Sequence, residues 1–382
     1  MTRRLDKLRH GRGFRRTSNV NQQSAPVFDL ESAVDALYVV AHPDDTLLFQ
    51  SPDILRRILD HRRVITIHVA AGDSGQEAKY WKKREEGILA AYAQMARSEN
   101  QWTSFSWRID GHDIALSVLT ELPGIQVAFM RLPDGGYPAG MGHTRYGSQS
   151  LLQLWNQSQV RLRTVDGANT YSREELLETL GSIMQRLSPR LIVVQDYFNA
   201  FSEGDHMDHY ATACFAREAR NRCHFDHRFV GYAGYRSQSL PVNVFGHQLA
   251  MKKSVFYTYG RFDPWACDSD ESCADTPYSE WLSRSQVVAS ETVGLVADAG
   301  FGEEINGGER VTLDASMSSF EGEVPMTYHW TQISGQNVVL EQEESCFPTF
   351  VAPMIQGPIV FSLVVSAGAQ RSEPAEVTIV VK

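Results

Sequence analysis

Two short clusters of histidine and aspartate carry the side chains best suited to chemistry in this chain. Residues 41–45 read Ala-His-Pro-Asp-Asp, and residues 204–209 read Gly-Asp-His-Met-Asp-His. Neutral histidine nitrogen and carboxylate oxygen both bind zinc, and a catalytic zinc site usually has three protein ligands and an open position for water. Together the clusters offer more ligands than one ion needs. They predict a shared metal site with further groups free to act on a substrate.

Simpler interpretations exist for each feature taken alone. The first cluster is also compatible with a polar turn in which an Asp serves as the N-cap of the next helix. A purely structural zinc would use four protein ligands and no base. The adjacent carboxylates of Asp44 and Asp45 are an unusual choice for such a closed site, so the pair of clusters favours a catalytic site.

Both clusters follow a short apolar run, at residues 37–40 and 191–194. Runs of this length are typical of buried parallel strands and are too short for a core helix. Pro43 fixes its own φ and keeps His42 extended, so the first turn is stiff where its polar groups emerge. Because ligands of open α/β sheets collect at the carboxyl ends of the strands, both clusters are expected at one sheet edge.

Strand and helix patterns alternate through the first two thirds of the chain. They predict a mainly parallel sheet covered by helices on both faces. A Ser-x-x-Glu capping box, Ser172 and Glu175, begins one of the helices. Further strands are expected at residues 64–69 and 127–132, and helices at residues 52–61, 79–95, 172–187 and 210–220.

The helical pattern stops near residues 285–296, and short alternating runs follow, separated by glycine and proline. Six or seven short strands in about 85 residues are typical of a β-sandwich. Trp330 is expected to pack between its sheets. The runs are residues 310–313, 326–331, 338–340, 348–351, 359–365 and 376–381. The expected division is a basic arm at 1–29, an α/β domain at 30–288 and an immunoglobulin-like sandwich at 289–382.

Composition limits the class of partner and the location. The 382 residues carry a formal net charge of −10, which argues against nucleic acid or an anionic membrane as the partner of the whole chain. No apolar run approaches the ~20 residues of a transmembrane helix. The basic residues 1–25 lack the apolar core of a signal peptide. Cys267 and Cys273 are compatible with either a local disulfide or free thiols.

The two clusters and the stretches between them resemble a known family. It comprises the zinc-dependent, LmbE-like de-N-acetylases, including the N-acetylglucosaminyl-phosphatidylinositol de-N-acetylases and the deacetylases of the mycothiol and bacillithiol pathways. The first cluster usually ends in Glu, where this chain has Thr46, and the last motif usually has Pro, where it has Met207; neither change removes a ligand. The matching stretches, in family order, are residues 41–45, 71–75, 84–86, 132–136 and 206–209.

The resemblance implies a Rossmann-like fold and a set of site residues. It implies removal of an N-acetyl group from an amino sugar or glycoconjugate at one Zn²⁺ ion, for which Fe²⁺ or Co²⁺ can substitute. Asp44 is then the general base, and His206 stabilises the oxyanion or protonates the amine. The implied metal ligands are His42, Asp45 and His209; the implied substrate contacts are Arg84 and Asp134; and Asp208 is implied to orient an imidazole.

Several alternatives stay open at this point. Arg84 has a competing role in helix-surface ion pairs with its acidic neighbours. A tyrosine shortly before the second cluster assists the oxyanion in some relatives, and here Tyr197 is the nearest candidate. Lys79, Tyr80 and Trp81 either line the rim of the pocket or are exposed helix residues, and the second role is taken by default. A metal-dependent glycan-binding protein without turnover and an esterase using the same metal are the competing functions.

The C-terminal runs resemble a second family, the polycystic-kidney-disease-type immunoglobulin-like modules. The resemblance rests on the stretches at residues 313–316, 328–332, 350–353 and 361–365. Such modules are common in multidomain extracellular and cell-surface proteins. A spacer is the expected role, with accessory glycan or surface binding as the alternative.

Overall fold

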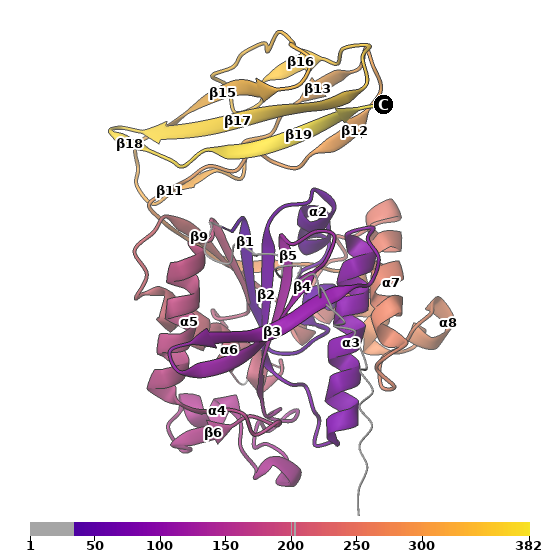
Figure 1. Cartoon of the computed structure of the whole chain (residues 1–382), viewed down its shortest axis with the longest axis vertical. Coiled ribbons are helices and arrows are strands. Elements are labelled where there is room, and N and C mark those ends of the chain that lie inside the picture. Colours follow the sequence, from indigo (N-terminus) through magenta and orange to yellow (C-terminus); the bar gives the residue numbers. More distant parts are fainter. Residues whose placement is uncertain (1–33, 200, 202–203) are drawn as a thin grey trace, which may run out of the picture. The chain divides into compact units, whose positions relative to one another are not determined.

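The computed structural model describes residues 34–199, 201 and 204–382. The predicted basic arm at residues 1–29 lies outside the described residues. An eight-stranded sheet forms the centre of the α/β domain (Figure 1). Its order is β10 (Val287–Val293), β9 (His227–Tyr232), β8 (Leu191–Gln195), β1 (Ala36–Val40), β2 (Val64–Ala70), β5 (Ile125–Leu132), β4 (His112–Leu119) and β3 (Trp102–Ile109).

The middle of this sheet is parallel and its edges are antiparallel. Strands β9, β8, β1, β2 and β5 run parallel, whereas β10, β4 and β3 pair antiparallel with their neighbours. Every residue of β1 and β2 is buried, as expected for strands covered on both faces. The chain runs from β1 outward through β2 and then returns to place β8 on the other side of β1. The carboxyl ends of β1 and β8 therefore form a switch point, where ligands bind in such sheets.

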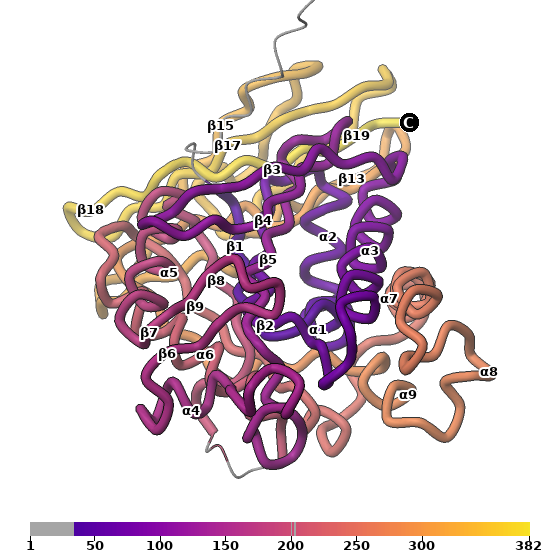
Figure 2. Tube along the Cα trace, turned by 60° about the horizontal axis from the view of Figure 1, so that its bottom comes forward, coloured from indigo at the N-terminus to yellow at the C-terminus, as the bar shows by residue number. Residues whose placement is uncertain are grey.

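Helices cover both faces of the sheet, as Figures 1 and 2 show. Helices α5 (Arg173–Leu187) and α6 (Met207–Arg220) pack together on one face, and α3 (Ala78–Met95) and α7 (Gly246–Gly260) pack together on the other. The remaining helices are α1 (Asp45–Leu48), α2 (Asp53–Leu59), α4 (Leu151–Trp155), α8 (Asp270–Cys273) and α9 (Pro277–Leu282), with short 3₁₀ turns η1 (Thr144–Tyr146) and η2 (Tyr235–Ser239). The small strands β6 (Arg161–Arg163) and β7 (Thr170–Ser172) pair with each other.

The C-terminal region is all β, and its core surrounds Trp330. That side chain is 1% exposed among buried aliphatic and aromatic residues, and its Nε1 donates to the carbonyl of Ser345 at 3.1 Å. The strands are β11 (Leu295–Val296), β12 (Glu303–Ile305), β13 (Arg310–Thr312), β14 (Ser319–Phe320), β15 (Met326–Ser334), β16 (Thr349–Val351), β17 (Gly357–Ala367), β18 (Gln370–Arg371) and β19 (Ala375–Val381).

The predicted fold class, α/β followed by an immunoglobulin-like sandwich, is confirmed, and so is the capping box of α5. Strands β3, β4, β9 and β10 and helix α7 were not predicted, and the predicted elements differ from the structure in places. Helix α6 begins at Met207 rather than at residue 210. Residues 338–340, predicted as a strand, contain none. Strand β10, which pairs with β9, contains the predicted domain boundary at residues 288–289.

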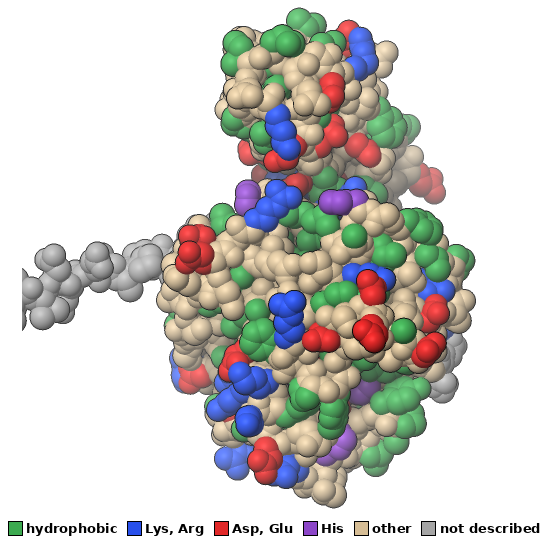
Figure 3. Space-filling model, turned by 90° about the vertical axis from the view of Figure 1, so that its right-hand side faces the viewer, with side chains coloured by type: hydrophobic (Ala, Val, Ile, Leu, Met, Phe, Trp, Pro, Cys, Tyr) green, Lys and Arg blue, Asp and Glu red, His purple; other side chains and the backbone are tan. Residues whose placement is uncertain are grey.

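The charge distribution on one face and the character of the helices complete the description. On the face drawn in Figure 3, Lys and Arg side chains lie among Asp and Glu side chains, with apolar groups between them. Within residues 34–199, 201 and 204–382, no helix combines the length and apolar character needed to cross a bilayer.

Candidate metal centre

The predicted site residues gather at the carboxyl ends of the sheet strands. His42 and Asp45 follow β1, Asp134 follows β5, and His206 and His209 begin α6 after β8. All eight predicted site side chains are buried: His42, Asp44, Asp45, Arg84, Asp134, His206, Asp208 and His209. Two turns far apart in sequence therefore form one buried site, as their position at the strand ends predicts.

The three predicted ligands converge. Nε2 of His209 lies 3.1 Å from Oδ1 of Asp45, and Nδ1 of His42 lies 3.8 Å from Oδ2 of Asp45. One donor atom from each of the three residues lies within 4.8 Å of the others. The donor set has two neutral nitrogens and one carboxylate, which suits a catalytic zinc site with an open position.

Carboxylates hold the far side of both imidazoles. Nε2 of His42 lies 3.2 Å from Oδ2 of Asp208, and Nδ1 of His209 lies 2.7 Å from Oδ1 of Asp205. A carboxylate only accepts hydrogen bonds, so the ring nitrogen beside it carries the proton. The other nitrogen of each ring faces Asp45 and is the one that would bind a metal ion. This arrangement is usual around ligating histidines.

One buried atom tests whether a metal fits. Nε2 of His209 is fully buried and has no hydrogen-bond partner within the described part of the chain, although it faces Asp45. Buried polar nitrogens are rarely left unpaired. A cation between His209, Asp45 and His42 would satisfy this atom, so the residues present fit a metal ion.

The pKa values of the same groups favour positive charge between them. Burial alone would raise the pKa of Asp45, but the His209 and His42 imidazoles hold it well below its usual range. Burial alone would lower the pKa of His209, but Asp45 and Asp205 raise it well above its usual value. A site that stabilises charge of this sign is suited to a cation.

Asp44 lies beside the ligands without joining them. It occupies the N-cap of α1, yet its side chain makes no capping bond there. Its Oδ1 instead accepts from Arg84 at 2.7 Å. Burial raises the pKa of Asp44, and the Arg84 guanidinium opposes that effect. The simple capping interpretation of the first cluster is therefore wrong for this side chain.

Arg84 is buried and fully engaged inside the protein. Its Nη1 donates to the carbonyl of Gly72 at 2.6 Å, and its Nε donates to the hydroxyl of Tyr259 at 2.6 Å and lies 2.9 Å from Asp263. The alternative of surface ion pairs for Arg84 is wrong. Its neighbours have other partners, because Glu85 pairs with Arg131 and Glu86 pairs with Lys83. Among the residues taken as exposed next to it, Trp81 is buried at 1% exposure.

His206 presents an N–H group to the site. Its Nδ1 accepts the backbone N–H of Asp208 at 3.1 Å, so the proton of its neutral ring is on Nε2. That nitrogen lies 3.7 Å from Oδ1 of Asp134. Burial lowers the pKa of His206 to about 4. Burial alone would raise the pKa of Asp134, but His42 and His206 lower it to about 2.

A second possible ligand set shares His42 and adds Asp134, His206 and Asp208. This set is the poorer fit for a metal, for two reasons. Nε2 of His206 carries a proton for the reason given above, and Nε2 of His42 already faces Asp208. Asp134 is held by the backbone N–H of Gly136 at 2.7 Å.

Aromatic residues that the sequence analysis did not single out line the site. The ring of Tyr235, just after β9, lies 5.1 Å from that of His209 and 6.1 Å from that of His206. Tyr137 is 58% exposed and its ring lies 6.2 Å from that of His206. Tyr197, the tyrosine suggested by the resemblance, packs on Phe229 instead.

Asp205 is the other residue that the analysis missed as a functional group. Its only signal in the sequence was its place four residues before His209. Tyr137 and Tyr235 had no local signal, because each reaches the site through the fold rather than through a motif. Tyr137 directly follows the matched stretch 132–136, whereas Tyr235 comes from the loop after β9.

Comparisons with known proteins agree with this geometry. Residues 37–220 match the family model described as PIG-L, GlcNAc-PI de-N-acetylase. Residues 299–381 match a family model described as a PKD domain. No curated protein sequence matches the chain at the significance level applied.

Similar solved structures include three that together span both parts. The PKD domain from KIAA 1837 protein is 30% identical, covers 25% of this chain and 91% of its own, and has a TM-score of 0.21. N,N'-diacetylchitobiose deacetylase from Pyrococcus horikoshii is 13% identical, with coverages of 66% and 75% and a TM-score of 0.36. GalB, the 4-carboxy-2-hydroxymuconate hydratase of Pseudomonas putida KT2440, is 13% identical, with coverages of 66% and 82% and a TM-score of 0.36.

Proposed function

Residues 37–220 form a PIG-L-type de-N-acetylase domain and residues 299–381 form a PKD domain, and from this we propose that the protein is a metal-dependent hydrolase. It removes an N-acetyl group from an amino sugar or glycoconjugate. The observation that carries the proposal is the convergence of donor atoms from His42, Asp45 and His209. Asp44 is not part of this group, and its carboxylate is held by Arg84. Zinc is the proposed metal, and Fe²⁺ or Co²⁺ would suit the same donors.

An acetamide is unreactive toward water at neutral pH, and a bound metal ion would supply the activation that it needs. When bound by His42, Asp45 and His209, it would polarise the amide carbonyl and lower the pKa of water to about 7. The protein's own residues do the rest. Asp208 and Asp205 hold the two imidazoles by their protonated nitrogens, so the metal-facing nitrogens stay fixed.

Asp44 is the proposed general base. It accepts a proton from the attacking water while the water oxygen bonds to the amide carbon, and Arg84 fixes the carboxylate for this role. When the carbon–nitrogen bond breaks, that proton passes to the departing amine. Acetate and the free amino sugar are the products.

His206 is the proposed oxyanion donor. Its Nε2–H points into the site because Nδ1 accepts the backbone N–H of Asp208. A fixed N–H aimed at the developing negative oxygen stabilises the transition state. The family resemblance assigned Asp134 and Arg84 as substrate contacts. We keep this proposed role for Asp134, whereas the proposed role of Arg84 is to position Asp44.

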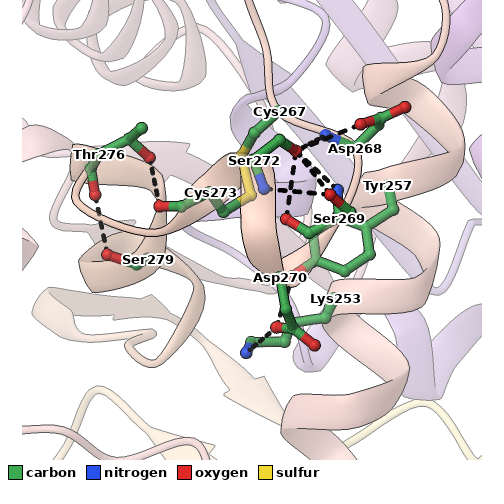
Figure 4. The surroundings of a disulfide bond; sticks show 10 residues. All are labelled: Lys253, Tyr257, Cys267, Asp268, Ser269, Asp270, Ser272, Cys273, Thr276 and Ser279. Atoms are coloured by element: carbon green, nitrogen blue, oxygen red, sulfur yellow. Dashed lines mark hydrogen bonds and ion pairs between the residues drawn. A yellow bond between two sulfur atoms is a disulfide. The ribbon is translucent and has the colours of Figure 1, made fainter.

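The compartment is part of the proposal. Cys267 and Cys273 form a disulfide (Figure 4), and stable disulfides are typical of oxidising compartments. PKD-type modules are common at cell surfaces. We propose that the protein works outside the reducing cytosol.

The decisive experiment measures acetate release. Purified protein is analysed for bound metal and assayed on N-acetylglucosamine derivatives before and after chelation. We expect activity to disappear with chelator and return with Zn²⁺. Asp44→Asn should keep the metal and lose about 10²–10⁴-fold in kcat, while Glu175→Gln at the remote capping box should match wild type. Full activity for Asp44→Asn, or activity that ignores metal removal, would contradict the mechanism.

A further inference from the structure

An exposed tryptophan is connected to Asp44 through two buried residues, Asp263 and Arg84, and lies outside the range matched by the deacetylase model. Trp265 is 57% exposed, and its ring packs on that of Tyr80 with centroids 4.9 Å apart. Tyr80 is half-buried in the first turn of α3. Single exposed aromatic residues are ordinary on protein surfaces. Exposure alone therefore assigns no role, and the contacts beneath the ring matter more.

Asp263 joins this aromatic pair to the proposed general base. It is 2% exposed. Its Oδ1 accepts the Tyr80 hydroxyl at 3.1 Å and the backbone N–H of Trp265 at 3.0 Å. Its Oδ2 lies 2.9 Å from Nε of Arg84, whose Nη2 donates to Asp44 at 2.7 Å. One buried arginine thus separates the carboxylate that fixes the aromatic pair from Asp44.

The guanidinium of Arg84 also lies near the Tyr80 ring, with its Cζ 5.9 Å from the ring centroid. The aromatic pair therefore borders the same arginine that holds the base.

The segment that follows Trp265 is fixed by a disulfide and by contacts to α7, and Figure 4 shows these residues. A disulfide joins Cys267 and Cys273, which are six residues apart in the sequence and follow Trp265. Asp270, the first residue of α8, accepts from Lys253 at 2.5 Å and from Tyr257 at 2.9 Å, both on α7. An aromatic side chain on a restrained loop loses little entropy when a ligand binds.

We propose that Tyr80 and Trp265 form a saccharide subsite, which binds the second sugar ring of a glycan whose N-acetylated ring lies at the metal centre. The indole offers a flat apolar face to the C–H face of a pyranose and keeps an N–H for a hydroxyl. Pockets of this type combine aromatic surface with a few fixed polar groups. This inference rests on the proposed function and adds a preference for substrates longer than a monosaccharide.

The test compares substrate lengths. Initial rates are measured on N-acetylglucosamine and on its β-1,4-linked disaccharide. Wild type should show a higher kcat/KM for the disaccharide. Trp265→Ala should lower the disaccharide-to-monosaccharide ratio of kcat/KM about tenfold, which corresponds to about 1.4 kcal/mol, and Trp265→Phe should retain most of the ratio. Phe347→Ala, at a 49% exposed aromatic in the C-terminal region, is the matched control and should leave the ratio unchanged.

Two outcomes would overturn the subsite: a wild type without length preference, or a Trp265→Ala variant that keeps it. Failure of the proposed function is recognised separately. If wild type hydrolyses neither sugar, calorimetric titration of the zinc-loaded protein with the disaccharide decides the question. Binding that Trp265→Ala loses supports the subsite, whereas equal binding by both proteins, or none by wild type, rejects it.

Discussion

Asp205→Asn is the sharpest perturbation that the candidate metal centre offers. Oδ1 of Asp205 accepts from Nδ1 of His209 at 2.7 Å and from the backbone N–H groups of His206 at 2.8 Å and Tyr235 at 2.9 Å. Oδ2 accepts the N–H of Gly234 at 3.1 Å. The amide of Asn has nearly the same shape but carries no charge, and its NH₂ group would face one of these donors.

The magnitude follows from these contacts. A hydrogen bond to a charged group contributes about 1.5–3 kcal/mol, against about 1 kcal/mol for a neutral pair, so the bond that holds His209 weakens by about 0.5–2 kcal/mol. Loss of a partner that orients a ligand typically lowers metal affinity about 10–100-fold. We therefore expect the Kd for Zn²⁺ to rise by about that factor, equivalent to about 1.4–2.7 kcal/mol.

The assay is competition for Zn²⁺ against a chromophoric chelator at neutral pH. Glu175→Gln replaces a partly exposed carboxylate of the α5 capping box with an amide and should leave the Kd unchanged. Far-UV circular dichroism and the urea midpoint check that Asp205→Asn is folded. Asp208→Asn makes the same test for His42. If both variants bind zinc as tightly as wild type while His209→Ala does not, carboxylate anchoring of the imidazoles is refuted.

Two further predictions concern stability. Burial alone would raise the pKa of Asp35, but Arg57 and Arg62 hold it below 3.8; the contribution of this carboxylate is therefore present at neutral pH and is lost as pH falls from about 4 through the folded-state pKa. In urea titrations the stability gap between wild type and Asp35→Asn should shrink over that range, and a gap constant down to pH ~3 would contradict this. Trp330→Ala should lower the free energy of unfolding of the C-terminal sandwich by about 3–5 kcal/mol, and a loss under ~1 kcal/mol would show that Trp330 is not central to its core.

Strands β1 and β8 were predictable because each contains a short and wholly apolar run, whereas β9, which begins with His227 and Arg228, was not predicted. Residues 37–40 in β1 and 192–194 in β8 are buried, as is typical of strands covered on both faces. The β3–β4 hairpin was missed because its outer strand, β3, lies at the sheet edge. Most residues of β3 are exposed or partly exposed, so the strand has no continuous apolar run. Helix α7 was missed because its buried stripe, at residues 252, 255, 256, 259 and 260, includes a lysine, and apolar residues also lie off the stripe. The buried Lys252 donates to three backbone carbonyls.

The residues of the candidate site were predictable only where they belong to a short sequence motif. His42 and Asp45 directly follow β1, and His209 lies in α6 after β8. The two compact motifs indicate a metal site at the strand ends, and the resemblance to the deacetylase family implies which residues are its ligands. Asp263 and Tyr235 act through long-range contacts that depend on how α3, α7 and the β9 turn pack. No local pattern reports such contacts, which explains why the residues around the motifs escaped sequence reasoning.

Asp205 lies next to a sequence motif and also makes long-range contacts. The carboxylate that fixes His209 also accepts the backbone N–H groups of Gly234 and Tyr235, so the metal-facing imidazole and the aromatic ring beside it share one anchor. A change that frees Asp205 would loosen both the ligand and the wall that faces the substrate. Metal affinity and KM should therefore change together in Asp205→Asn, whereas Trp265→Ala, anchored through Asp263, should alter sugar selectivity without altering the Kd for Zn²⁺.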